Sequence, residues 1–288
     1  MGISPALGPA REIALSTGRI RYHDSGTGSP VVFVHGLLVN ADIWRKVVPG
    51  LAAAGHRCLT PDWPLGAHSI PMPEADLTPT GLADLIAEFL DALDLTDVTV
   101  VANDTGGALT QLLMTRRPDR IGRVVLAAVD CYEVFPPFPF GALLKVAKWP
   151  GTIAPLLAPM RWKPVQRLPL GFGWVTKHAL PEEIAQSYLA PARRDAAIRA
   201  DLRRFAAGVS NRDTLAAAER FAGVDLPVRV IWSTEDKLFP MALAERLVAD
   251  LPRASLHTVE DSYTFLPEDQ PELLTELIVE FTRLHAAP

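Results

Sequence analysis

The stretch VTVVANDTGGALTQLL, from Val98 to Leu113, joins a buried strand to a helix with no loop between them. Its first half is a β-branched apolar run, which is typical of strands covered on both faces. The run ends in Ala-Asn-Asp-Thr-Gly-Gly, and a helical pattern begins at once. Asp104 is therefore predicted at the apex of a tight turn, where burial makes an unpaired carboxylate costly. One interpretation is that Asp104 is a plain helix N-cap.

Similar apolar runs recur along the chain and alternate with helical segments. The runs are VVFVHG, RCLTPD, VTVVAND, RVVLAAVD and VRVIWSTED, and the helical segments include TPTGLADLIAEFLDALDL. This alternation predicts an α/β fold with a mostly parallel central sheet flanked by helices. The segments EIALS and RIRYHDSG alternate in polarity around Thr17-Gly18, which predicts an antiparallel hairpin before the parallel strands.

The alternation is interrupted once, by a segment rich in aromatic residues and prolines. This segment begins near Cys131 and continues into the helical stretch PEEIAQSYLAPARRDAAIRADLRRF. We expect residues 1–130 and 222–288 to form the α/β core. Residues 131–221 are predicted to form a helical cap over the carboxyl edge of the sheet, with an ordinary helical subdomain as the alternative.

Composition narrows the classes of partner. The chain has 288 residues, a net charge of −5 and scattered Lys and Arg, which argues against nucleic acid. No apolar stretch reaches about 18 residues and no signal peptide is evident, so we expect a cytoplasmic protein with no membrane partner. Cys58 and Cys131 lie in apolar contexts without a CxxC pair. We expect a small-molecule substrate, and a homodimer stays open.

Neither a metal nor an organic cofactor is expected. The seven histidines show no HExxH spacing and no His-Cys cluster. The glycine-containing segment SGTGSP lies in a turn and does not open a helix, as a dinucleotide-binding loop would.

Polar residues follow several of the predicted parallel strands. In open α/β sheets, sites form beyond the carboxyl ends of the strands. His35, Asp104, Asp130 and Asp236 occupy such ends. These four residues are therefore the first candidates for a site.

On these residues the chain resembles proteins of the α/β-hydrolase fold over nearly its whole length. In that fold the nucleophile lies in a small-x-nucleophile-x-small turn, and Ala102 to Gly106 fit that pattern with Asp104 in the nucleophile position. The helix that follows supplies N–H groups that favour an anion. An Asp nucleophile is similar to the haloalkane dehalogenase and epoxide hydrolase branch. That resemblance implies an oxyanion hole formed by the N–H groups of Leu37 and Thr105.

The chain departs from this branch at its halide-binding positions. Dehalogenases of the branch usually carry Trp after the nucleophile and a partner such as Asn after His-Gly. Thr105 and Leu37 occupy those places here.

A larger departure concerns the catalytic base. Near the C-terminus the family has Gly-His-Phe, whereas this chain reads EDSYTFLPEDQPELL, so Thr264 falls in the place of the histidine. A threonine hydroxyl cannot act as a base near neutral pH. By position Asp236 is the acid partner, with Asp130 as the second candidate.

Other side chains are candidates for the missing roles. His35, His68 and His178 are the histidines that we consider as replacement bases. Tyr132 or Tyr188 would protonate an epoxide oxygen from the cap. The candidate substrate contacts are His35, Tyr132, Trp174, His178 and Tyr188.

Three functions remain open. The first is an epoxide hydrolase-like enzyme that acts on a small apolar electrophile through Asp104. The second is a non-hydrolytic isomerase, cyclase or lyase in which Asp104 is the acid/base, because loss of the histidine removes the group that activates water. The third is a catalytically inactive module that binds a ligand under the cap.

Overall fold

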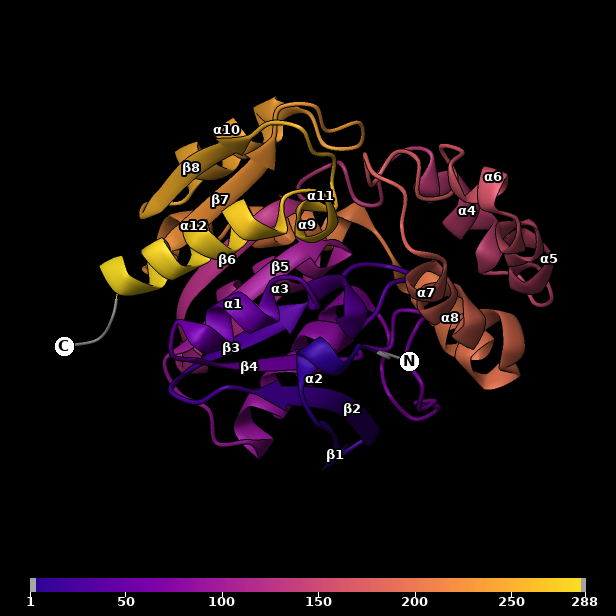
Figure 1. Ribbon diagram of the computed structural model, residues 1–288, viewed down its shortest axis with the longest axis horizontal. Helices are drawn as coiled ribbons and strands as arrows, with labels where there is room; N and C mark the ends of the chain where they lie inside the picture. The colour runs from indigo at the N-terminus through magenta and orange to yellow at the C-terminus, as the bar shows by residue number, and fades with distance from the viewer. Residues whose placement is uncertain (1–3, 286–288) are drawn as a thin grey trace.

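A twisted sheet runs through the molecule, as Figure 1 shows. The computed structural model describes residues 4–285. Within that range the sheet has eight strands in the order β1-β2-β4-β3-β5-β6-β7-β8. Their bounds are β1 (Ala10–Leu15), β2 (Gly18–Ser25), β3 (Ser29–Val34), β4 (His56–Pro61), β5 (Val98–Asp104), β6 (Ile121–Val129), β7 (Val228–Ser233) and β8 (Ala254–Val259).

The strand pairing confirms the predicted fold class. β1 and β2 form an antiparallel hairpin in which Leu15 lies opposite Gly18, and β2 joins β4 in antiparallel fashion. All pairs from β4 to β8 are parallel. β5 and β7 are buried at every position, as continuous apolar runs predict. The carboxyl ends of the parallel strands therefore meet at one edge of the sheet.

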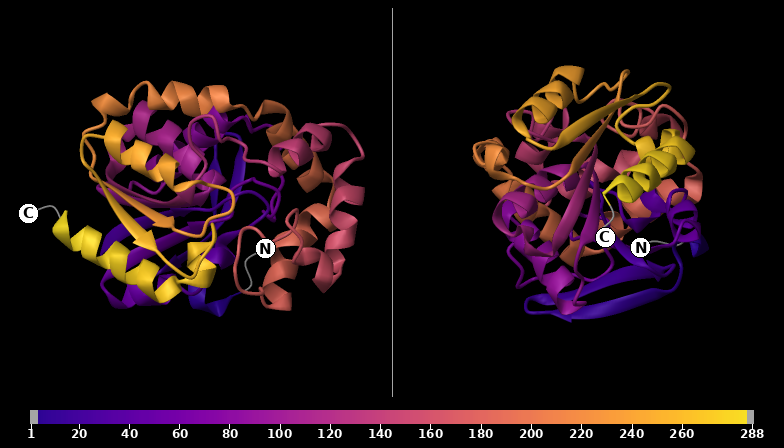
Figure 2. Two further views of the ribbon diagram at one scale, coloured as in Figure 1. Left: turned by 90° about the horizontal axis from the view of Figure 1, so that it is seen from above. Right: turned by 90° about the vertical axis from the view of Figure 1, so that its left-hand side faces the viewer.

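Helices cover both faces of the sheet, and the right-hand view of Figure 2 separates the two groups. α1 (Val48–Ala53) packs against α12 (Pro271–Leu284), while α3 (Thr105–Arg116) packs against α2 (Pro79–Ala92) and α9 (Asn211–Ala218). α10 (Met241–Asp250) lies on β7 and β8. The remaining short elements outside the cap are α11 (Leu266–Asp269), η1 (Pro5–Leu7), η2 (Ala41–Trp44), η3 (Pro118–Arg120) and η5 (Phe221–Gly223).

A group of helices between β6 and α9 lies beyond the carboxyl edge of the sheet, at the right of Figure 1. These cap helices are α4 (Phe140–Ala147), α5 (Ile153–Leu157), η4 (Ala158–Arg161), α6 (Lys163–Gln166), α7 (Glu182–Arg194) and α8 (Ala196–Gly208). α9 packs on α3 and therefore belongs to the core. The last cap helix is α8, which ends at Gly208, before the expected limit at residue 221.

The cap and the core share one cluster of buried apolar side chains. The cap therefore has no separate core of its own. Among residues 4–285, no helix has the length and apolar character needed to cross a bilayer.

Candidate functional site

Asp104 ends β5 and immediately precedes α3, with φ 54° and ψ −133°. A positive φ is uncommon for a residue with a side chain and is strained. Small neighbours make the turn sterically feasible. A Cβ on Gly106 would lie 2.1 Å from the carbonyl oxygen of Val34, and one on Gly36 would lie 2.0 Å from Oδ2 of Asp104. The predicted strand-to-helix turn is therefore present, and its backbone leaves no room for larger residues.

The carboxylate of Asp104 is buried at the edge of an apolar cavity. Its Oδ2 accepts a hydrogen bond of 3.2 Å from the N–H of Leu37. Burial raises the pKa of Asp104 to about 6, although hydrogen bonds from the N–H groups of Thr105 and Leu37 lower it and the charge of Asp236 raises it again. Asp104 is thus mainly ionised at pH 7, but its pKa is higher than the N-terminus of a helix alone would make it.

Asp130 lies next to the turn and contacts Thr105, the residue after Asp104. Its Oδ2 accepts a 2.9 Å hydrogen bond from Oγ1 of Thr105, while its Oδ1 is buried without a hydrogen-bond partner. Burial raises the pKa of Asp130 well above its ordinary range, and the charge of Asp104 adds to the effect. Low dielectric and the neighbouring carboxylate therefore both favour the neutral acid form of Asp130.

Asp236 and Thr264 form a second pair at the same edge. Oδ1 of Asp236 accepts hydrogen bonds from the N–H groups of Leu238 (2.8 Å) and Phe239 (2.9 Å) and from Oγ1 of Thr264 (3.0 Å). Burial raises the pKa of Asp236 to about 6. The Thr264 hydroxyl is thus committed to Asp236, and Thr264 is not among the residues that line the cavity.

Sequence reasoning missed Asn103, which ties the turn to the loop of Thr264. The Nδ2 of Asn103 donates to the carbonyl oxygens of Ala127 (2.6 Å) and Thr264 (2.7 Å). Asn103 occupies a variable position of the turn, so its sequence context carried no signal for this contact.

His35 supports the backbone of the site and does not face substrate. Its Nε2 accepts a 2.8 Å hydrogen bond from the N–H of Trp63, so its Nδ1 is the protonated nitrogen and donates to the carbonyl oxygen of Gly36 at 2.9 Å. Burial lowers the pKa of His35 to about 4. Both ring nitrogens of this neutral imidazole are therefore used by backbone groups.

Neither of the other two candidate histidines reaches Asp104. His68 is buried, with Nε2 3.0 Å from Oδ2 of Asp201, and it lines a separate groove with residues of α7 and α8. The side chain of His178 is more than half exposed and lies near Asp261. In the part of the chain that the structure describes, no histidine lines the cavity at Asp104.

The candidate aromatic contacts also point elsewhere. Tyr132 donates its hydroxyl to Asp250 at 2.8 Å, and Tyr188 donates to Glu268 at 3.1 Å. Tyr132, Tyr188 and Trp174 do not line the cavity. The two tyrosines join the cap to the core by these hydrogen bonds, and the expectation that they face a substrate is not met.

The cavity between cap and core has a volume of about 300 Å³. Phe140, Leu144, Leu157 and Met160 line it from the cap, and Leu37 and Phe265 line it from the core. Asp104 and Thr105 are the polar side chains among its described lining residues. Such an enclosure suits a largely apolar ligand and places one ionisable group against it.

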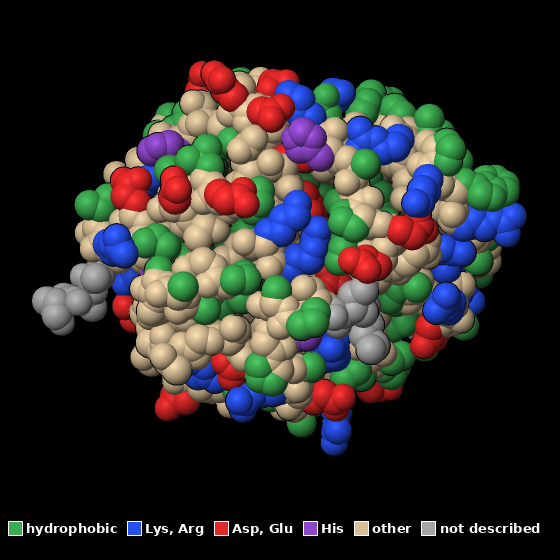
Figure 3. Space-filling model, in the orientation of Figure 1, with side chains coloured by type: hydrophobic (Ala, Val, Ile, Leu, Met, Phe, Trp, Pro, Cys, Tyr) green, Lys and Arg blue, Asp and Glu red, His purple; other side chains and the backbone are tan. Residues whose placement is uncertain are grey.

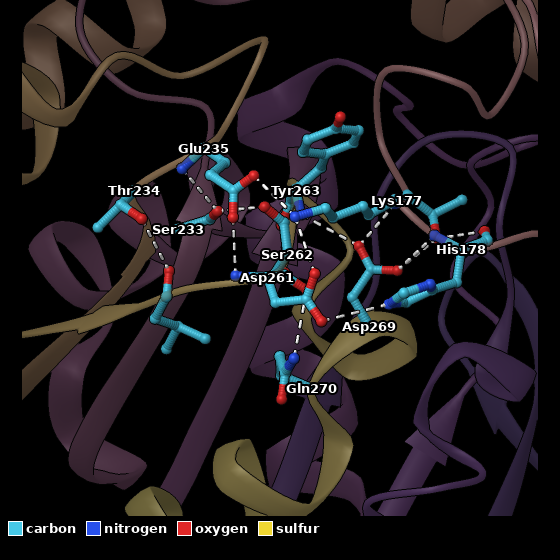
Figure 4. Close-up of polar contacts among 12 residues, drawn as sticks. Lys177, His178, Ser233, Thr234, Glu235, Asp261, Ser262, Tyr263, Asp269 and Gln270 are labelled. Carbon is cyan, nitrogen blue, oxygen red and sulfur yellow. Dashed lines mark hydrogen bonds and ion pairs between the residues drawn. The ribbon is translucent and has the colours of Figure 1, made fainter.

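A polar cluster holds the cap against the loop of Thr264, as Figure 4 shows. The carboxylate of Asp269 accepts hydrogen bonds from the N–H groups of Lys177 (2.8 Å), His178 (3.1 Å) and Tyr263 (3.0 Å). The ammonium of Lys177 lies 2.7 Å from Glu235 and 2.8 Å from Asp261. His178 thus contributes its backbone to a joint between cap and core. Among residues 4–285, no three His, Cys, Asp or Glu side chains are grouped as a metal site.

Comparison with known proteins agrees with this architecture. Residues 29–271 match the family of the alpha/beta hydrolase fold, and the chain belongs to that family. It is 26% identical to the "Uncharacterized hydrolase YugF" of Bacillus subtilis (strain 168), over 96% of this chain and 99% of that protein. It is 28% identical to haloalkane dehalogenase 2 of Mycobacterium tuberculosis (strain ATCC 25618 / H37Rv), over 92% of each chain.

A solved structure extends the comparison. The epoxide hydrolase CorEH superposes with a TM-score of 0.76 at 19% identity, over 96% of this chain and 99% of that one. The chain is thus an α/β-hydrolase-fold protein related to haloalkane dehalogenases, and it shares its fold with an epoxide hydrolase.

Proposed function

We propose that this chain is an enzyme in which Asp104 acts as the acid/base on a small apolar substrate, in a reaction that does not consume water. One observation carries the proposal: Asp104 is the ionisable side chain that faces the apolar cavity, and no histidine accompanies it among the described lining residues. A pKa of about 6 gives the carboxylate both useful basicity and a usable conjugate acid near neutral pH.

The proposed step is an internal proton transfer. Oδ2 of Asp104 is held by the N–H of Leu37, so Oδ1 is the oxygen assigned to the substrate proton. Oδ1 takes a proton from a C–H or O–H bond of the substrate, and the electron pair forms a new bond within the substrate. The carboxylic acid then returns the proton to another atom. Isomerisation, ring closure and elimination within an apolar molecule fit this balance.

The surroundings of Thr264 support a reaction without water. Hydrolysis of an alkyl ester on Asp104 would need a group that takes a proton from water. The Thr264 hydroxyl donates to Asp236 and does not line the cavity. A base at that position is therefore missing, and apolar walls disfavour ordered water at Asp104.

A second candidate is alkylation of Asp104 by an electrophile such as an epoxide or an alkyl halide. The relationship to haloalkane dehalogenases and the strained turn at Asp104 favour it. One carboxylate oxygen would form a bond to carbon while the C–O or C–halogen bond breaks. Without a base for water, the resulting ester should persist.

Isotope labelling and intact-protein mass spectrometry separate these functions. The protein is incubated with unsaturated ketones, epoxides and alkyl halides in D2O and in 18O-labelled water. We expect deuterium in recovered substrate or product and no 18O in the product. Deuterium exchange and product formation should both be lost in Asp104→Asn. Turnover with 18O in the product would overturn the proposal. A stoichiometric adduct on wild type alone would instead establish the second candidate.

A gain-of-function variant sharpens the test. Thr264→His would place an imidazole beside Asp236, where it can activate water. If alkylation occurs, the adduct should decay in Thr264→His and persist in Thr264→Val. Binding of panel members with no exchange, adduct or product in any variant would point to a ligand-binding module.

A further inference from the structure

Exposed apolar side chains are concentrated in the first part of the cap. Eight large hydrophobic side chains are exposed among residues 4–285, and six of them fall between residues 138 and 170. Trp149 is 62% exposed and Trp162 is 54% exposed. We call these six the cap patch: Phe138, Val146, Trp149, Trp162, Leu168 and Leu170. Large contiguous apolar surface on a folded domain usually marks an interaction site.

Positive charges outnumber negative ones in the segment that carries the cap patch, although Lys163 pairs with Glu182 at 3.3 Å and Lys177 pairs with Glu235 and Asp261. Residues 134–181 contain six Lys or Arg and no Asp or Glu, in a chain whose net charge is −5. The rest of the chain therefore carries a net charge of −11. Figure 3 shows Lys and Arg next to apolar side chains at the edge of the molecule that the cap forms.

The cations lie directly beside the exposed tryptophans. The ammonium of Lys148 is 5.8 Å from the ring of Trp149, and the guanidinium of Arg161 is 4.7 Å from the ring of Trp162. Tryptophan prefers the level of lipid headgroups, and Lys and Arg bind anionic headgroups while their stems cover apolar surface. The pairing matches the chemistry of a membrane interface.

The cap patch is continuous with the cavity above Asp104. Leu168 and Leu170 are each about half exposed and also line the cavity. An apolar molecule dissolved in a bilayer that touches the cap patch would therefore meet the cavity without crossing water.

We propose that the cap patch binds the surface of an anionic lipid bilayer, in contrast to the expectation from the sequence of no membrane partner. A second copy of the chain fits this face less well, because a two-fold contact would set its positive charges against each other. An anionic bilayer offers negative headgroups to the Lys and Arg side chains and an apolar interior to the exposed apolar side chains of the cap patch. Binding would be peripheral, with side chains inserted at headgroup level.

Vesicle binding of the full chain tests this proposal without any assay of activity. The probes are vesicles of phosphatidylcholine alone and of phosphatidylcholine with phosphatidylglycerol. We expect binding to the anionic vesicles that weakens with salt, and quenching of tryptophan fluorescence by brominated lipid. Lys145→Glu/Lys148→Glu and Trp149→Ser/Trp162→Ser should each weaken partitioning by at least about tenfold.

Matched controls separate the cap patch from general charge and apolarity. Arg19→Glu/Arg117→Glu changes the net charge equally on the core, and Leu273→Ser/Leu284→Ser removes exposed leucines from α12. Both controls should bind as wild type does. The proposal is overturned if anionic vesicles do not bind, or if controls and cap variants lose binding alike. A dimer in solution that the cap variants abolish would also overturn it, by assigning the face to a second copy.

Discussion

The turn at Asp104 and the loop at Thr264 lie at the same edge of the sheet, yet they are constrained in different ways. At the turn, backbone contacts leave no space: a Cβ on Gly106 would lie 2.1 Å from the carbonyl oxygen of Val34. In the loop, the backbone is held by Asn103 and Asp269, while the Thr264 side chain makes one hydrogen bond to Asp236. The side chain at position 264 can therefore be replaced without a change in the backbone conformation of the loop.

This difference indicates how chemistry can change within a constant fold. A nucleophile position depends on a strained backbone that tolerates few sequences. A base at position 264 would depend on one side chain, and the hydrogen bonds that Asn103 and Asp269 make to this loop use backbone atoms of Thr264 and Tyr263. If the two regions differ in this way, substitutions in the turn should reduce both activity and stability strongly, whereas a substitution of Thr264 should have a small effect.

The largest effect is expected from Asp104→Asn. Asparagine tolerates a positive φ and nearly keeps the shape of the side chain, but it cannot accept and return a proton. Asp104-dependent proton exchange should fall by about 10²- to 10⁴-fold. The exchange rate in D2O measures this, with Asp213→Asn, a carboxyl outside the cavity, as the control. Equal exchange rates in wild type and Asp104→Asn would show that Asp104 does not take part in proton transfer.

Gly106→Ala should destabilise the fold strongly. Its Cβ would meet the backbone of β3, which cannot shift without disturbing the sheet, so we expect a loss of roughly 3 kcal/mol in the free energy of unfolding. Urea unfolding measures this loss. Gly223→Ala is the control, because a Cβ there meets nothing within 4 Å. A loss no greater than in the control would show that the turn is less constrained than we infer.

Asp104 in the turn and Asp236, the hydrogen-bond partner of Thr264, should both make stability depend on pH. The pKa values of Asp104 and Asp236 are raised to about 6, so between about pH 4 and 6 the folded state binds more protons than the unfolded state. Each carboxyl thus contributes stability at low pH that is lost as pH rises through about 6, on the order of 2 to 3 kcal/mol.

Single variants isolate each contribution. Relative to wild type, Asp104→Asn and Asp236→Asn should gain stability as pH rises from about 4 to 7 and then level off. Thermal unfolding at several pH values measures these differences. Parallel profiles for wild type and a variant would show that the corresponding carboxyl has an ordinary pKa in the folded state.

Thr264→Val should have the smallest effect. Valine keeps the volume of threonine but removes the hydroxyl that donates to Asp236, which costs about 1 kcal/mol and raises the pKa of Asp236 further. Chemical unfolding measures the loss against Thr258→Val on exposed β8. A loss as large as that of Gly106→Ala would contradict the contrast between loop and turn.

The sequence predicted the fold and the turn because both follow local rules. Buried parallel strands appear as continuous apolar runs, and the turn at Asp104 appears as small residues around one polar residue. The same reasoning brought His35, Asp104, Asp130 and Asp236 to one edge, since the carboxyl ends of parallel strands meet there, whereas Thr264 was placed by the family resemblance. It placed Tyr132 and Tyr188 in the cavity wrongly, because the direction of a cap side chain depends on how the cap packs on the core.

The sequence by itself determined the α/β fold, its family and the position of Asp104 at the carboxyl edge of β5. Only the tertiary structure decided that His35 serves the backbone and that His68 and His178 lie away from Asp104. It also decided that Asp104 and Thr105 are the polar side chains among the cavity-lining residues that the structure describes. The physical reason is range. Periodicity and turn sterics act between near neighbours in the chain, whereas contacts between distant segments depend on loop paths and packing that no local pattern encodes.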